Sequence, residues 1–377
     1  MKPKVAYFTN VAPHYREKIW LAFIENLKVE FHFFFGKHPN PSIKSIDFEE
    51  PRWQEYQKQI HDIENIKFKG RLIYQAGVIK QILFNNWDVI ILLGDANIIS
   101  NWITAIIARF RDVPVIFWGH GIYGNEMYLK KKIRKIFLSL ADINLVYGHW
   151  AKNQMIKENF NPEHIKVIYN SLDYQQSKAL REIVIIPRFY KPYFKNIQKT
   201  FIFIGRLTKQ KKLHLLIYSL SELAEKDQHF NLMIIGDGQE KENLRTLAKK
   251  LHVNVYFMGA CYDEKKIAEC MANADFCVSP GNVGLTAIHA MSYGTPVCTN
   301  NDFSNQGPEF EAIQSWETGC FFDWNQQNLT ETIINWFEKA PKRELVREQC
   351  YRIVDENYNP NTQTEILKKA IKELTIH

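Results

Sequence analysis

Two cationic side chains follow a predicted strand in the second half of the chain. The stretch TFIFIG (200–205) reads as a buried strand that ends at Gly205, and Arg206 and Lys211 follow that glycine one and six residues later. A guanidinium grips phosphate oxygens through two parallel N–H bonds, and an ammonium adds a point charge. The spacing indicates either a phosphate-binding turn or a solvated basic turn, and the pair alone does not separate these alternatives.

A glycine-containing loop that leads into a helix lies further along the same half. In the stretch PGNVGLTAIHAMSYGTPV (280–297), Gly281 and Gly284 predict a loop, and the apolar residues that follow have helical spacing. Free backbone N–H groups and the helix dipole attract anions to such a helix start. The stretch therefore indicates either a second phosphate-binding element or an ordinary strand–loop–helix corner.

The elements around these residues alternate between strands and helices. Strands are predicted at 5–10, 29–35, 89–93, 114–120, 143–148 and 166–170, and then at 200–205, 230–236, 255–259, 276–280 and 297–299. Helical patterns between them are typical of doubly wound parallel sheets. We expect an α/β fold with two Rossmann-like domains facing a cleft, and ligands outside the carboxyl ends of the strands.

The domain boundaries are predicted from a change of pattern. The segment 187–199 contains two prolines and no apolar period, so we predict a linker there. The first domain would cover 1–186 and the second 200–359, and Pro360 would begin a separate last helix at 360–377.

Composition excludes several classes of protein. The chain is 46% hydrophobic and 24% charged, as is usual for a soluble globular protein, and no stretch predicts a membrane span or an apolar leader. A net charge of +7 favours anionic ligands or a membrane surface but is too weak to indicate nucleic acid. The six cysteines form no C-x-x-C pair, so we expect reduced thiols in a cytoplasmic protein and neither zinc nor disulfides.

The order of these motifs resembles that of the family-4 glycosyltransferases, which have the GT-B fold. The similarity is strongest over 201–322 and rests on FIGRL…K (203–211), IIGDG (234–238), ADFCVSP (274–280), GLTAIHAMSYGTPV (284–297) and PEF…TGCFF (308–322). APHYREKIW (12–20), WGHG (118–121) and YNSLD (169–173) extend it into the first half. The resemblance implies that the last helix crosses back to the first domain, as is common in such chains.

The resemblance also implies residue roles in the second half. Arg206 and Lys211 would bind the diphosphate of a nucleotide sugar, and they would stabilise it as the leaving group. Gly205 and Gly236 end the strands beside this site, and the backbone around Gly284, Leu285 and Thr286 would contact the same phosphates. The implied reaction is retaining sugar transfer without a metal or other cofactor, with a UDP-sugar as donor, and the sequence contains no D-x-D.

One part of the family pattern is missing. Two glutamates spaced E-x7-E usually cross this loop and helix, but Gly281 and His289 stand in their places. We expect His289 to hydrogen-bond a hydroxyl of the donor, with a core histidine as the alternative. Glu309 matches a glutamate that the family often has and is expected near the donor, ahead of Glu311.

Candidate residues in the first half follow predicted strands. His14, Tyr15 and Arg16 lie after the first strand and are expected to contact the acceptor, unless they simply begin a helix. His120 lies between two glycines at a strand end, so we expect it to touch the donor sugar or the acceptor as a catalytic residue. Asp95 has the same position after its own strand and is expected in the acceptor site.

The stretch 128–140 predicts a basic amphipathic helix, with five cations among apolar residues. Its apolar residues would either pack on the sheet or lie on an anionic membrane, and its cations would attract lipid headgroups. The expected location is the cytoplasm, with weak attachment to the inner face of the membrane.

The sequence therefore predicts an enzyme that transfers a sugar from a nucleotide diphosphate sugar to a glycan or lipid-linked acceptor, in the synthesis of a cell-surface polysaccharide (capsule or O-antigen) or glycolipid. Two alternatives stay open. One is a nucleotide-sugar epimerase of the same fold, and the other is a catalytically silent nucleotide-sugar-binding partner protein, which the missing glutamates would favour.

Overall fold

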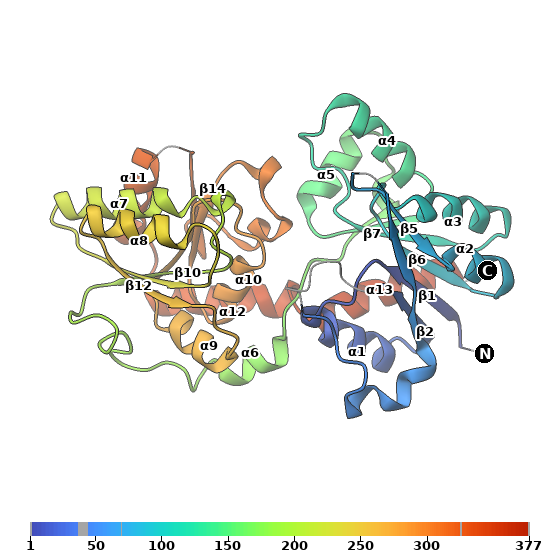
Figure 1. The fold of residues 1–377 in the computed structure, drawn as a ribbon, viewed down its shortest axis with the longest axis horizontal. Helices are drawn as coiled ribbons and strands as arrows, with labels where there is room; N and C mark the ends of the chain where they lie inside the picture. Colours follow the sequence, from blue (N-terminus) through green and yellow to red (C-terminus); the bar gives the residue numbers. More distant parts are fainter. Residues whose placement is uncertain (1, 37–43, 69, 325, 376–377) are drawn as a thin grey trace. The chain divides into compact units, whose positions relative to one another are not determined.

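The computed structural model describes residues 2–36, 44–68, 70–324 and 326–375. The chain forms two compact units, and Figure 1 shows their elements. The first unit combines 1–172 with 360–377, and the second is the continuous stretch 173–359. Each unit is built on one parallel sheet with helices on it, so the predicted α/β fold with two Rossmann-like sheets is confirmed.

The first unit has a seven-stranded parallel sheet in the order β3-β2-β1-β6-β7-β8-β9. Its strands are β1 (Lys4–Thr9), β2 (Glu30–Phe35), β3 (Ile60–Asp62), β6 (Val89–Leu93), β7 (Val115–Gly119), β8 (Ile143–Val146) and β9 (Ile165–Val167). A separate antiparallel hairpin, β4 (Glu64–Lys67) with β5 (Ile73–Ala76), lies in the connection between β3 and β6.

Helices cover both faces of this sheet. They are α1 (Glu17–Asn26), α2 (Val78–Phe84), α3 (Ile99–Phe110), α4 (Tyr128–Leu138), α5 (His149–Lys157) and α13 (Pro360–Thr375). Side chains of successive strand residues point to opposite faces. Val5 and Tyr7 of β1 pack in a core with α1 and α13, whereas Ala6 and Phe8 pack in a second core with α2 to α5.

The second unit has a six-stranded parallel sheet in the order β12-β11-β10-β13-β14-β15. Its strands are β10 (Thr200–Ile204), β11 (Asn231–Ile235), β12 (Asn254–Gly259), β13 (Phe276–Ser279), β14 (Val297–Asn300) and β15 (Gly319–Phe322). Its helices are α6 (Tyr174–Leu180), α7 (Leu213–Glu225), α8 (Lys241–Lys250), α9 (Glu264–Ala272), α10 (Thr286–Ser292), α11 (Gln326–Lys339) and α12 (Arg343–Asn357). Helix α7 packs on α11, and α10 packs on α12.

The boundary between the first unit and the second follows Leu172. It therefore lies before the segment 187–199, which the sequence predicted as a linker. Tyr190 and Phe194 of that segment are buried in the second unit, and the Tyr190 hydroxyl donates to the carbonyl of Cys270. The prolines of the segment thus belong to a packed surface stretch of the second unit.

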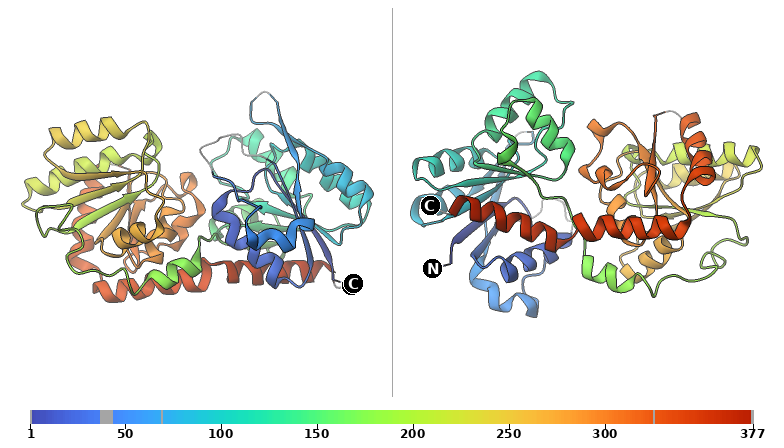
Figure 2. Two further views of the ribbon diagram at one scale, coloured as in Figure 1. Left: turned by 60° about the horizontal axis from the view of Figure 1, so that its bottom comes forward. Right: turned by 180° about the vertical axis from the view of Figure 1, so that it is seen from behind.

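Helix α13 belongs to the first unit although α12, which precedes it, belongs to the second. It packs on α1, and Figure 2 shows its whole length (dark red) from two further sides. Its Leu367, Ala370 and Ile371 are buried in the same core as the residues of α1.

Among the described helices, none combines the length and hydropathy needed to cross a bilayer.

Candidate active site

The carboxyl edge of the second sheet is held together at the ends of β10 and β11. Gly205 and Gly236 have φ of 145° and 143°, a region that L side chains rarely adopt. A Cβ at Gly236 would overlap the carbonyl oxygen of Gly205, so the two strand ends approach more closely than side chains allow. The Leu207 amide also donates to the Asp237 carbonyl at 2.9 Å, which fixes the turn that carries Arg206.

Lys211 is tied to the glycine loop that leads into α10. Its Nζ donates to the carbonyl of Asn282 at 2.5 Å, and the Gly281 amide donates back to the Lys211 carbonyl at 3.0 Å. Burial lowers the pKa of Lys211, against the opposing effect of the Glu309 carboxylate. Glu309 is itself only 5% exposed, so the structure places it beside this cation.

Helix α10 begins beside the end of β10, because the Thr286 hydroxyl donates to the carbonyl of Ile204 at 3.0 Å. Gly284, just before the helix, has a φ of 53°, which a glycine adopts without strain. The structure therefore brings Arg206, Lys211 and the backbone at 284–286 to one edge of the sheet. Because α10 has only seven residues, its dipole is short, and the two cations supply most of the positive charge.

Gly281, which the sequence predicts to replace the first glutamate of the family pattern, has no room for a side chain. A Cβ at this position would overlap the carbonyl of Gln210 and crowd the Cα of Lys211. The loop of Lys211 thus occupies the space that a side chain at 281 would need. A carboxylate side chain at 281 would therefore require this loop to move.

His289, which the sequence predicts to replace the second glutamate, has a carboxylate partner from another helix. Its Nε2 lies 2.8 Å from an oxygen of Glu264 in the first turn of α9, and the Tyr293 hydroxyl donates to the same oxygen at 2.5 Å. Burial raises the pKa of Glu264, but the hydrogen bonds from His289 and Tyr293 outweigh it, and the pKa is lowered overall. No sequence pattern indicated this cluster, because Glu264 and His289 are 25 residues apart and lie on different helices.

A pocket of about 640 Å³ lies at the carboxyl edge of the first sheet. Asp95 follows β6, His120 follows β7 and Tyr147 follows β8, and all three line it. Lys67 and Arg71 line it from the β4–β5 hairpin. Tyr123 and Arg134 also line it and, like Lys67, Arg71 and Tyr147, were not among the predicted site residues. The sequence predicted that His120 and Asp95 follow strands. No motif indicated that Lys67 and Arg71 of the hairpin would line the same pocket.

Arg16 lies beside this pocket and the other two residues of its motif do not line it. Its guanidinium donates to the Tyr147 hydroxyl at 2.9 Å and lies over the rings of Trp118 and Tyr147. His14 is exposed, and its Nδ1 lies 3.0 Å from the carbonyl of Lys44, while Tyr15 is 41% exposed. The structure thus brings Arg16, Asp95 and His120 together, with His14 and Tyr15 outside the pocket lining.

The His120 ring is held in its neutral form. Its pKa is lowered to about 4, mainly by burial, with the nearby cations Arg16 and Arg134 acting in the same direction and Asp95 partly opposing them. A neutral imidazole has one donor and one acceptor nitrogen, so His120 can accept a proton or a hydrogen bond at neutral pH.

This pKa predicts how stability depends on pH. The unfolded chain takes up a proton at His120 near pH 6.5, but the folded chain does so only near pH 4, so the unfolded state binds more protons between these values. Stability should therefore fall as the pH falls through this window. Urea unfolding at several pH values should show a flatter profile for His120→Asn than for the wild type. Parallel profiles would contradict the shifted pKa.

Comparison with known proteins identifies the second unit. Residues 189–352 match the family model described as Glycosyl transferases group 1. An uncharacterized glycosyltransferase from Methanocaldococcus jannaschii is 30% identical over 219 residues, which cover 56% of this chain and 52% of that protein. The chain thus spans about half the length of this curated relative.

Solved structures match the whole chain. HepE from Anabaena in complex with UDP has a TM-score of 0.70 and 16% identity, over 98% of this chain and all of that one. The lipopolysaccharide outer core galactosyltransferase WaaB has a TM-score of 0.72 and 16% identity, over 98% of this chain and 99% of that one. The predicted GT-B fold is confirmed by these structures, and residues 189–352 are similar to the glycosyltransferase group 1 model, while assignment to family 4 stays a prediction.

Proposed function

We propose that this protein transfers a sugar, with retention, from a nucleotide diphosphate sugar to a glycan or lipid-linked acceptor. The observation that carries the proposal is the meeting of Arg206, Lys211 and the backbone at 284–286 inside the segment that matches the glycosyltransferase model. Two fixed cations can stabilise a leaving diphosphate as its charge grows. The complex of HepE with UDP supports a UDP-sugar as donor.

The pocket of the first unit is proposed as the acceptor site. Lys67, Arg71 and Arg134 line it with one carboxylate, Asp95, whose Oδ1 accepts from the amide and side chain of Asn97. This excess of positive charge favours an acceptor that carries phosphate or carboxylate groups, as lipid-linked glycans and acidic polysaccharides do. His120 is proposed to act on the transferred sugar or the acceptor hydroxyl.

The test is a screen of UDP-, GDP-, ADP- and CMP-sugars by thermal shift, followed by nucleotide release with a mixed acceptor panel in excess EDTA. A ligand that binds only the native state raises the melting temperature. A transferase releases nucleotide only with an acceptor, and the proposed metal-free stabilisation predicts that turnover survives EDTA. Turnover without any acceptor would indicate the epimerase. Binding without turnover would indicate the silent partner, which Gly281 and His289 favour.

His289 is proposed to contact the nucleotide while Glu264 holds its ring in place. His289→Ala should weaken nucleotide binding by about 1–2 kcal/mol, the value of one hydrogen bond to a polar partner. Glu264→Gln keeps an oxygen acceptor at the same place, so it should change affinity much less and serves as the matched control. Calorimetric titration measures both. Unchanged affinity in a folded His289→Ala variant would leave the histidine a purely structural role.

Helix α4 is proposed to attach the protein weakly to an anionic membrane surface. Phe137 and Leu138 pack in the core, but Leu129, Ile133 and Ile136 are 66%, 45% and 52% exposed. Lys130 and Lys132 are exposed on the same helix. Exposed apolar side chains among lysines are typical of helices that lie in a lipid headgroup layer.

Vesicle flotation tests this attachment. The protein should float with vesicles that contain anionic lipid, and Leu129→Ser with Ile133→Ser should lose about tenfold or more in partitioning, because each removes several apolar carbons from the lipid. Ile197→Ser is the matched control, since Ile197 is 87% exposed but lies in the second unit. Equal flotation of the two variants would refute the assignment to α4.

A further inference from the structure

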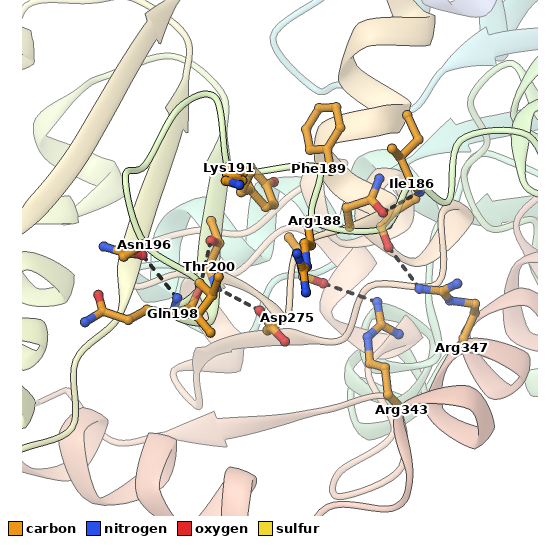
Figure 3. A pocket seen from close by; sticks show the side chains of 15 residues that line it. Ile186, Arg188, Phe189, Lys191, Asn196, Gln198, Thr200, Asp275, Arg343 and Arg347 are labelled. Carbon is orange, nitrogen blue, oxygen red and sulfur yellow. Dashed lines mark hydrogen bonds between the residues drawn. The ribbon is translucent and has the colours of Figure 1, made fainter.

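A second pocket, of about 290 Å³, lies at the opposite edge of the second sheet. Thr200 begins β10 and Asp275 immediately precedes β13, so the pocket is at the amino ends of strands whose carboxyl ends lead to Arg206 and the glycine loop. The segment 186–198 forms one wall, and the end of α9 with the start of α12 forms another (Figure 3). It is therefore distinct from both sites described above.

Positive charge dominates this pocket. Arg188, Lys191, Arg343 and Arg347 line it, and Figure 3 shows the three guanidiniums with Asp275, which is the one carboxylate in its lining. Within the described part of the chain, no carboxylate comes within 4.0 Å of any of these four cations. The Asp275 carboxylate is hydrogen-bonded to the sheet, since its Oδ2 accepts from the Thr200 amide at 2.7 Å. Burial raises the pKa of this carboxyl group.

The two arginines of α12 are fixed by neutral partners. Arg343 donates to the carbonyls of Gly294 and Ala274, and Arg347 donates to the carbonyl of Ala272 at 2.9 Å. These bonds satisfy carbonyls at the ends of α10 and α9, as basic side chains often do at helix C-termini. A carbonyl does not neutralise a guanidinium, however, so both charges remain in a partly buried place.

The lowered pKa of Arg343 shows that its surroundings disfavour the charged form of the side chain. Its pKa is lowered to about 10, mainly by burial, with the charge of Arg347 acting in the same direction and Asp275 among the groups that oppose them. The Nε of Arg347 is buried and has no hydrogen-bond partner within the described residues. Capping of the helix ends explains the three hydrogen bonds that Arg343 and Arg347 donate. It does not explain why their charges have no carboxylate partner, or why Arg188 and Lys191 line the facing wall.

We propose that this pocket binds the phosphoryl group of a small phosphorylated molecule. Planar guanidiniums match phosphate oxygens with paired N–H bonds, and an anion between the two walls would compensate the charges of Arg343 and Arg347. The volume holds a phosphate with a small organic group and is too small for a whole nucleotide sugar. The proposal concerns binding alone and does not depend on the proposed transferase activity.

Calorimetric titration of the full chain tests the site, with inorganic phosphate and a hexose phosphate as separate probes at constant ionic strength. Arg188→Glu with Lys191→Glu is the test variant, because both side chains are exposed and make no described side-chain hydrogen bond. Lys249→Glu with Lys250→Glu on α8 is the control, because it changes the net charge equally on another surface. Arg206→Ala removes a cation from the proposed diphosphate site.

The test variant should weaken phosphate binding by about tenfold or more, the scale for lost bonds between charged partners, while the control and Arg206→Ala keep a saturable phosphate site. Tighter binding of the hexose phosphate than of phosphate would identify an organic phosphate as the ligand, and equal binding would identify the free anion. Wild-type affinity in the test variant, no saturable binding in the wild type, or loss of all binding in Arg206→Ala would overturn the proposal.

Discussion

Arg206→Ala should lower kcat by about a hundredfold or more, the scale for losing one preorganised group that stabilises developing charge. Arg206 follows β10 at the carboxyl edge of the sheet and is exposed, and within the described residues its side chain makes no hydrogen bond or ion pair. Its guanidinium is therefore available to a ligand. Because the diphosphate gains charge as the sugar bond breaks, the loss in kcat should exceed the loss in nucleotide affinity.

Two further variants make this result specific. Lys209→Ala removes an exposed cation three residues away on the same turn, and its kcat should stay near that of the wild type. Arg206→Lys should restore only part of the rate, because an ammonium lacks the planar fork. Steady-state kinetics on folded variants decides the matter. A wild-type rate for Arg206→Ala would remove the diphosphate assignment and most of the case for a nucleotide-sugar enzyme.

Gly281→Glu, which restores the glutamate of the family pattern, should inactivate the protein rather than improve it. The added Cβ overlaps the carbonyl of Gln210 and crowds Lys211, and both contacts are with backbone. Overpacking of this kind costs about 1–3 kcal/mol or more, and here it would also move the cation that faces the diphosphate site. Urea unfolding and kinetics should therefore both show a loss.

The controls separate size from charge. Gly281→Ala adds the Cβ without the carboxylate and should reproduce most of the destabilisation. Gln210→Glu adds one negative charge at an exposed position of the facing loop and should leave the free energy of unfolding within about 0.5 kcal/mol of the wild type. A stable and more active Gly281→Glu variant would show that the loop can open and that the glycine is not required.

The fold, and the meeting of Arg206, Lys211 and the glycine loop at one sheet edge, were predictable because they depend on local pattern. Buried parallel strands give apolar runs, and glycines with cations directly after them mark the carboxyl edge, as at 200–211. Glu264 was not predictable as the partner of His289, because that contact depends on the packing of α9 beside α10. The cations of the β4–β5 hairpin were missed for the same reason, since only the fold brings Lys67 and Arg71 to His120.

The segment 187–199 illustrates a limit of composition. Prolines and an irregular pattern are typical of linkers, yet Tyr190 and Phe194 are buried in the second unit. A segment of irregular backbone can pack as firmly as a helix when its aromatic side chains are buried against neighbouring elements. The sequence alone does not show which elements those are. The phosphate pocket depends on this packing, because Arg188 and Lys191 reach it from this segment.

The place of α13 bears on how the protein is made. Residues 1–172 are synthesised before the second unit, but the core of their own unit also needs Leu367, Ala370 and Ile371, which are synthesised after the second unit. The second unit is continuous, so all of its residues have been synthesised before α13. Of the two units, the one whose synthesis begins earlier is thus completed later, and until then the face of α1 that α13 covers is exposed to water and to chaperones.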